Sequence, residues 1–114
     1  IGNKLVQGLG VGNGSVIGKA VVANSAEEAN SKVKEGDILV AKTTDPDYNP
    51  AIKKASGLVV EASGLTSHAA VIGLSLGIPV VVGATDATDK ISDGSTITVD
   101  ARRGAIYQGE ISNL

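Results

Sequence analysis

One histidine stands out as a residue that could do chemistry. His68 is the only histidine among 114 residues, and it follows Thr66 and Ser67 in the segment GLTSHAAVIGLSLGIPVVVG. This segment reads as the start of a helix, where backbone N–H groups lack helical partners and the helix dipole is positive, so an anion is favoured. The same field disfavours a protonated ring and leaves a neutral, nucleophilic imidazole. His68 is therefore a candidate phosphoryl acceptor, with Thr66, Ser67 and the backbone at Gly64 as candidate phosphate-binding groups.

A structural role for the same histidine is the alternative from the residues alone. In that case His68 is a partly buried, hydrogen-bonded side chain that completes a helix end. A Ser–His–Asp hydrolase is disfavoured because Ser67 is adjacent to His68 in the chain, where a nucleophile–base pair is awkward. A zinc site is disfavoured because one histidine and scattered carboxylates supply too few ligands. We therefore expect no metal ligands here.

Other charged residues have simpler interpretations than catalysis. Asp45 and Asp47, and likewise Asp86 and Asp89, lie beside predicted helix starts, where caps and turns explain them. The pair Arg102–Arg103 falls at the tip of a predicted hairpin, where basic residues are usually solvated. None of these residues is predicted to be catalytic.

Composition limits the kinds of protein that this chain can be. It is 42% hydrophobic but 2% aromatic, contains no cysteine and has a formal net charge of -2. The absence of cysteine suits a reducing compartment, and we expect a cytoplasmic protein. Scattered basic residues predict no nucleic-acid partner, and no apolar run predicts a membrane span or a signal peptide. The chain begins with Ile1 rather than Met, which suggests a piece of a longer protein.

The elements that must position His68 alternate between strands and short helices. Residues 1–14 form a glycine-rich lead-in or tether, and residues 15–114 form one compact α/β domain. The predicted strands cover about 15–23, 37–43, 58–62 and 80–83, followed by a hairpin on either side of residues 101–103. The predicted helices begin at Ser25, at Asp47 or Asn49, and at Thr66 or Ser67, and they end near Gly36, Gly57 and Gly77.

The segment around His68 resembles the phosphohistidine motif in the mobile, or swivelling, domain of phosphoenolpyruvate-utilising enzymes. The upstream segment TTDPDYNPAIKKASGLVVEASG is similar to the preceding part of the same family pattern, and the likeness covers nearly the whole chain. The resemblance implies a β/β/α swivelling fold. It also implies that His68 accepts a phosphoryl group, with Thr66 and Ser67 holding its oxygens and Gly64 permitting close approach.

Three departures from the family pattern bear on this role. The arginine that follows the motif histidine in the family is replaced by Leu74, and the glycine pair is Ser63–Gly64. The acidic step before that pair retains only Glu61, with Ala62 following. Loss of a charge-assisted arginine–phosphate bond costs about 1.5–3 kcal/mol. Gly73, next to Leu74, is expected to weaken its helix by about 1 kcal/mol relative to Ala.

This variant of the motif is more similar to the extra C-terminal domain of pyruvate kinases from Bacillus-like bacteria. That resemblance implies a parent enzyme that transfers phosphoryl from phosphoenolpyruvate to ADP, with Mg²⁺ and K⁺ in a catalytic barrel outside these residues. It implies catalytic domains in cis and a homotetrameric parent, with no cofactor in this fragment. The fragment itself is then expected to be structural or regulatory and not catalytic alone.

Two alternatives to that interpretation are retained. One is an active phosphocarrier domain of a pyruvate phosphate dikinase or phosphoenolpyruvate synthase, with His68 as the phosphoryl acceptor. The other is a helix-start site that binds phosphate or a phosphorylated effector without being phosphorylated.

Overall fold

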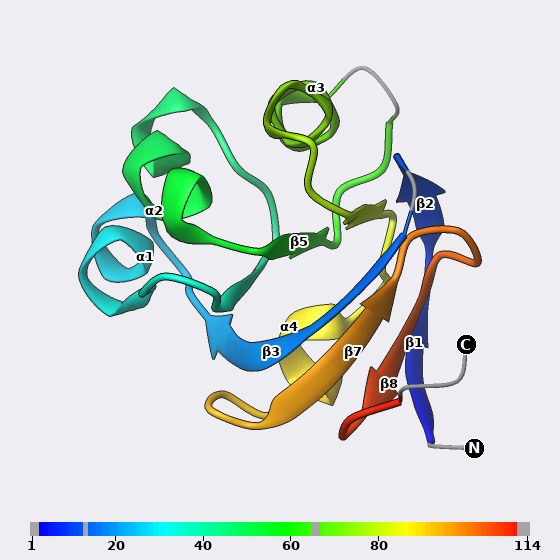
Figure 1. Cartoon of the computed structure of the whole chain (residues 1–114). Helices are drawn as coiled ribbons and strands as arrows, with labels where there is room; N and C mark the ends of the chain where they lie inside the picture. Colours follow the sequence, from blue (N-terminus) through cyan, green and yellow to red (C-terminus); the bar gives the residue numbers. More distant parts are fainter. Residues whose placement is uncertain (1–2, 13, 65–66, 112–114) are drawn as a thin grey trace.

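Eight strands form one continuous sheet in the computed structural model, which describes residues 3–12, 14–64 and 67–111 (Figure 1). The order across the sheet is β1-β8-β7-β3-β4-β5-β6-β2. In chain order the strands are β1 (Lys4–Gln7), β2 (Leu9–Val11), β3 (Ser15–Val22), β4 (Ile38–Ala41), β5 (Gly57–Val60), β6 (Val80–Val82), β7 (Thr96–Asp100) and β8 (Ala105–Gln108).

The centre of the sheet is parallel, and a helix connects each pair of parallel strands. Strands β3, β4, β5 and β6 run parallel, whereas β7 and β8 form an antiparallel hairpin beside β3. Helix α1 (Ala26–Lys32) precedes β4, the 3-10 helix η1 (Pro46–Tyr48) and α2 (Asn49–Lys54) precede β5, α3 (His68–Leu76) precedes β6, and α4 (Ala87–Lys90) precedes β7. The predicted alternation and the final hairpin are confirmed.

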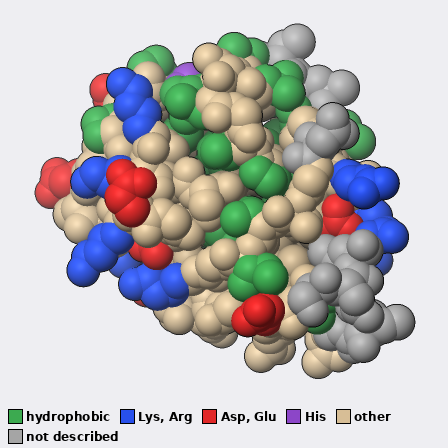
Figure 2. All heavy atoms as spheres, viewed as in Figure 1, with side chains coloured by type: hydrophobic (Ala, Val, Ile, Leu, Met, Phe, Trp, Pro, Cys, Tyr) green, Lys and Arg blue, Asp and Glu red, His purple; other side chains and the backbone are tan. Residues whose placement is uncertain are grey.

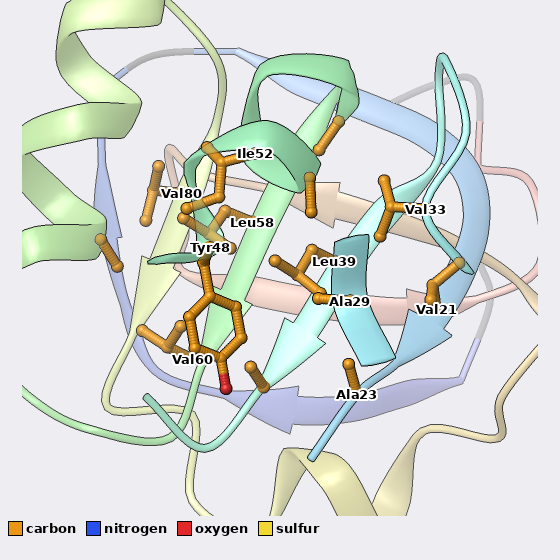
Figure 3. Close-up of a cluster of buried hydrophobic side chains, with 14 of the residues drawn as sticks. Val21, Ala23, Ala29, Val33, Leu39, Tyr48, Ile52, Leu58, Val60 and Val80 are labelled. Carbon is orange, nitrogen blue, oxygen red and sulfur yellow. The ribbon is translucent and has the colours of Figure 1, made fainter. Parts of the chain in front are cut away.

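Two hydrophobic cores lie on opposite faces of the parallel strands. Because side chains alternate along a strand, Leu39 of β4 packs beneath the helices, whereas its neighbours Ile38 and Val40 pack against the antiparallel half of the sheet. Figure 3 shows the first core, in which Tyr48 and Ile52 cover the strands. The result is three layers, with the antiparallel half, the parallel half and the helices stacked in that order, which confirms the expected β/β/α arrangement.

The glycine-rich lead-in is part of the sheet, which corrects the interpretation of residues 1–14 as a tether. Strand β1 pairs with β8 and β2 pairs with β6, so one stretch of chain supplies both outer strands of the sheet. Gly8 lies between them and donates its amide to the carbonyl of Gly104 at 2.7 Å. The sequence hides these strands because their partners lie far away in the chain. The lead-in begins beside the C-terminal hairpin, where Lys4 is opposite Tyr107 and the amide of Gln108 donates to the carbonyl of Asn3 at 2.8 Å.

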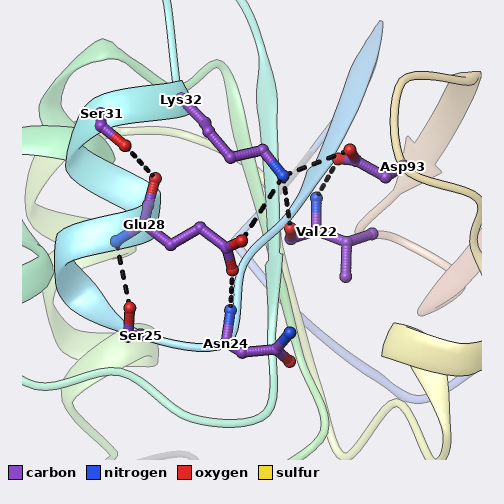
Figure 4. A network of polar contacts seen from close by, with 7 residues as sticks. All are labelled: Val22, Asn24, Ser25, Glu28, Ser31, Lys32 and Asp93. Atoms are coloured by element: carbon purple, nitrogen blue, oxygen red, sulfur yellow. Dashed lines mark hydrogen bonds and ion pairs between the residues drawn. The ribbon is translucent and has the colours of Figure 1, made fainter.

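Helix α1 begins at Ser25, as predicted. The Ser25 hydroxyl accepts from the amide of Glu28 at 3.1 Å, and the Glu28 carboxylate accepts from the amide of Asn24 at 2.6 Å. Lys32, in the last turn, reaches the carboxylate of Asp93 at 3.2 Å (Figure 4). A hydrogen bond from the Val22 amide is the main cause that lowers the pKa of Asp93. These contacts tie α1 to β3 and to the loop before β7.

The second helical segment begins earlier than predicted. Neither Asp47 nor Asn49 caps it; instead, Asp45 accepts from the amide of Asp47 at 2.9 Å and starts η1. Helix α2 follows η1 without a side-chain cap and ends at Lys54, before Gly57. Because Asp45 supplies the cap, the side chain of Asn49 is available for another contact.

Candidate functional site

His68 is the first residue of α3, as predicted. Ser67 is the N-cap, and its hydroxyl accepts from the amide of Ala70 at 3.4 Å. Gly77 ends the helix in the left-handed conformation, at φ 73°. Thr66, the other predicted cap and phosphate-binding residue, lies outside the described residues. The local sequence therefore places the imidazole at the positive end of a nine-residue helix.

Both ring nitrogens of His68 have hydrogen-bond partners. Nδ1 lies 2.8 Å from Oγ1 of Thr44, and Nε2 lies 3.0 Å from Oδ1 of Asn49. Thr44 is buried and the other two residues are half-buried. In Figure 2 part of the histidine is visible at the upper edge of the molecule, next to hydrophobic side chains. These contacts match the structural role that was the alternative for His68, a hydrogen-bonded ring that completes a helix end.

Parallel strand pairing brings the three residues together. Thr44 follows β4, whereas His68 follows β5, and these strands are parallel neighbours. Their carboxyl ends therefore meet at one edge of the sheet, which is where ligand sites of open α/β sheets occur. Asn49 reaches the same edge from the first position of α2. The site thus has the location expected of a functional site in this class of fold.

Gly64 has a backbone conformation that favours glycine. Its φ is 125°, and among the described residues a Cβ at this position would lie 4.0 Å from Cβ of Ser67. The backbone conformation therefore explains the glycine. The roles of Gly64, Thr66 and Ser67 in phosphate binding stay predictions.

The position of the family arginine carries an exposed apolar side chain. Leu74 is 55% exposed, and Val71 and Leu76 of the same helix are also exposed. Hydrophobic side chains are visible around α3 in Figure 2. Position 74 therefore supplies no cation for a phosphoryl group on His68.

Among the aspartates that were expected to form caps or turns, one caps a helix and another does not. Asp45 is a cap, but Asp86 makes no side-chain cap bond at the start of α4. The side chain of Glu61 instead bonds the first turn of α4. Its Oε2 accepts from the amide of Thr88 at 2.8 Å and from the Thr88 hydroxyl at 2.5 Å. These two hydrogen bonds lower the pKa of Glu61.

The hairpin turn uses one of its two arginines internally. Asp100 is 1% exposed and accepts from the amides of Arg102 and Arg103 at 3.0 and 3.4 Å. It also pairs with the Arg103 guanidinium at 2.8 Å. Arg103 therefore neutralises a buried carboxylate, and Arg102 is exposed.

Thr44 and Asn49 were not among the predicted site residues. Thr44 stands in the TTDPD segment that resembles the family pattern, so a signal for it was present. Asn49 precedes Pro50, and that order suggested a helix cap. Nothing in the local pattern indicated that its amide contacts the imidazole.

The described ranges contain no group of three or more His, Asp or Glu side chains arranged to hold a metal ion. Within those same ranges, no helix has the length and apolar character needed to cross a membrane.

Comparison with known proteins identifies the class. The family model for the mobile domain of PEP-utilising enzymes matches residues 33–104, which include Thr44, Asn49 and His68. The chain belongs to this family. A solved structure of Enzyme I superposes with a TM-score of 0.61 and 27% identity, covering 73% of this chain and 34% of that one.

Individual relatives are more specific. The chain is 85% identical over its full length to a pyruvate kinase of Lactobacillus delbrueckii subsp. bulgaricus, and it spans 19% of that relative. It is 46% identical over 110 residues to a phosphoenolpyruvate synthase of Aeropyrum pernix, spanning 13% of that relative. The chain therefore spans about a fifth or less of the length of these two relatives.

Proposed function

We propose that this chain is the phosphohistidine-like mobile domain of a bacterial pyruvate kinase. The support is the 85% identity over all 114 residues to such an enzyme. The parent would transfer phosphoryl from phosphoenolpyruvate to ADP in the cytoplasm, giving pyruvate and ATP. Its catalytic domains, with their Mg²⁺ and K⁺ sites, would lie in the remaining chain and contact this domain in cis within a homotetramer.

Within that enzyme the domain has a structural or regulatory role and is not a phosphoryl carrier. The observation that carries this proposal is the pair of hydrogen bonds that His68 makes through its two ring nitrogens, with Thr44 and Asn49. The apolar Leu74 at the family arginine position is consistent with it, because an oxyanion on His68 would lack a planar cation there.

Deleting these residues from the parent pyruvate kinase tests the proposal. We expect kcat for phosphoryl transfer to ADP to be largely unchanged, while the thermal midpoint, the tetramer or the response to phosphorylated effectors changes. Full-length His68→Ala is the matched control and should also retain turnover. Loss of chemistry with stability and assembly intact, or no change in any of these properties, contradicts the proposal. The residues encoded upstream of Ile1 give a further check, because a catalytic barrel is expected there.

A phosphocarrier domain of a synthase-like enzyme is the second candidate. It is favoured by the 46% identity to a phosphoenolpyruvate synthase and by the intact TSHAA segment. An ATP-grasp domain would then be encoded upstream of Ile1. Incubation of the complete parent with labelled phosphoenolpyruvate should give an acid-labile, base-stable phosphate that is absent from His68→Ala. No label in the complete parent excludes this candidate.

A further inference from the structure

The side chain of Asn49 covers the nitrogen of His68 that points away from Thr44. Its Oδ1 lies 3.0 Å from Nε2, and this is the contact that the Asn49 side chain makes within the described part of the chain. Asn49 opens α2, and its own backbone amide is already bonded to the carbonyl of Pro46. The side chain therefore acts on the imidazole and not on the helix end.

The chemistry of the two partners defines the tautomer of the ring. An amide oxygen is only an acceptor, so Nε2 must carry the hydrogen and donate it to Asn49. In a neutral ring the lone pair is then on Nδ1, which accepts from the hydroxyl of Thr44 at 2.8 Å. Each ring nitrogen thus has the partner that this tautomer requires.

Accepting a phosphoryl group at Nε2 requires the opposite tautomer. The lone pair must be on Nε2, and the proton must be on Nδ1. Thr44 can adapt, because its hydroxyl can accept from Nδ1–H as well as donate to Nδ1. The oxygen of Asn49 cannot adapt, and turning its amide over places an NH₂ group against Nε2, which would occupy the lone pair as a donor.

We propose that Asn49 is a positioning residue that holds His68 in the Nε2–H tautomer and keeps Nε2 from accepting a phosphoryl group. The inference rests on the proposed function, since it explains why the domain is not a carrier. Nδ1 offers no second route, because it is bonded to the buried Thr44.

The tautomer can be measured directly. His68 is the only histidine, so long-range ¹H–¹⁵N spectra of the 114-residue chain contain one imidazole. The unaltered chain should show a protonated, pyrrole-type Nε2 and a pyridine-type Nδ1. Asn49→Ala should shift the ring toward the Nδ1–H form, whereas Asn49→Asp keeps an acceptor oxygen and should retain Nε2–H. The Nδ1–H tautomer in the unaltered chain overturns the proposal.

Phosphoramidate tests reactivity without any partner enzyme. The Nε2 lone pair attacks phosphorus, an Nε2–P bond forms, the N–P bond of phosphoramidate breaks, and ammonia leaves; the ring proton stays on Nδ1. Asn49→Ala should be phosphorylated about tenfold faster than the unaltered chain, which corresponds to about 1.36 kcal/mol of barrier. The double variant Asn49→Ala with His68→Ala should take no base-stable label.

Asn30→Ala is the matched control. Asn30 accepts from the amide of Ala51 at 3.0 Å and donates to the carbonyl of Asp47 at 2.9 Å, so it holds the same segment without contacting the ring. This variant should react like the unaltered chain. Equal phosphorylation rates for the unaltered chain and a folded Asn49→Ala, with folding checked by circular dichroism, overturn the proposal about Asn49. A different result contradicts the proposed function, namely labelling of the complete parent enzyme by phosphoenolpyruvate.

Discussion

Gly73 of α3 packs directly against Val80 of β6, and a Cβ at position 73 would overlap Cγ2 of that valine. The glycine that weakens the helix in isolation therefore permits the helix to approach the sheet. Gly73→Ala should lower the free energy of unfolding by about 1–2 kcal/mol, because overpacking outweighs the gain of about 1 kcal/mol in helix propensity. Urea unfolding measures this difference.

The exposed Ser75 of the same helix provides the control for that prediction. Ser75→Ala changes helix propensity without a clash and should not destabilise the protein. Adding Val80→Ala to Gly73→Ala should cost less than the sum of the two single changes, since the smaller side chain leaves room for the new methyl group. If Gly73→Ala is more stable than the unaltered chain, the contact with Val80 does not exclude a methyl group at position 73.

Glu61 should make stability depend on acid pH. Hydrogen bonds from the hydroxyl and the amide of Thr88 are the main causes that hold its pKa below the ordinary 4.5, against the raising effect of burial. Because the pKa is lower in the folded state, this stabilisation is complete above about pH 4.5 and is lost as the pH falls through the folded-state pKa. Glu61→Gln should therefore be less stable than the unaltered chain by about 1 kcal/mol at neutral pH.

The difference between Glu61→Gln and the unaltered chain should shrink as the pH falls below 4.5 and through the lowered folded-state pKa of Glu61. Urea unfolding across this pH range is the measurement. Asp89→Asn changes an exposed acid of α4, the helix whose Thr88 donates to Glu61, and is the control for a general charge effect. A stability difference that stays constant over the whole range would contradict the assignment to Glu61.

Asp100 and Arg103 should contribute unequally to stability, although they form one ion pair. Asp100→Ala removes the acceptor of two turn amides and leaves a buried vacancy, so we expect a loss of about 2–4 kcal/mol. Arg103→Ala leaves the buried carboxylate without its cation but still bonded to both turn amides, so it should cost less than Asp100→Ala, about 1–2 kcal/mol. Thermal unfolding of the two variants distinguishes these values, and equal losses would contradict the interpretation.

Gly10 should tolerate no larger residue. A Cβ there would overlap the backbone carbonyl of Ala101, so Gly10→Ala requires β2 to move away from the turn after β7. We expect a loss of at least about 3 kcal/mol in urea unfolding. Gly94→Ala is the comparison, because its Cβ meets open space and only its positive φ opposes the change, at about 1 kcal/mol.

Local signals predicted most of the central elements. The apolar runs in β4, β5 and β6 and the cap at Ser25 are visible in short windows, and the hairpin follows from strand patterns on both sides of a turn. Strands β1 and β2 were missed because both are short, Gly8 separates them, Gly10 interrupts β2, and their partners are distant in the chain. Gly10 is explained by its close contact with the backbone of Ala101, and that contact can be seen only in the folded chain.

The candidate site was predictable only in its centre. Ser67 and the helix start identified His68, but Thr44 and Asn49 lie 24 and 19 residues before it. Thr44 and Asn49 come close to His68 because β4 pairs with β5 in parallel register, and this pairing cannot be read from a short stretch of sequence. The sequence therefore left open a reactive imidazole and a hydrogen-bonded structural one, and in the folded chain both ring nitrogens have hydrogen-bond partners.

The hydrogen bond between Gln108 and Asn3 means that the chain enters and leaves the fold at one corner (Figure 1). A unit of this kind can be joined to a host polypeptide, or inserted into one of its surface loops, without separating the flanking segments of the host. This geometry makes the fold a portable module, suited to recombination between enzymes as different in length as the relatives in which it occurs.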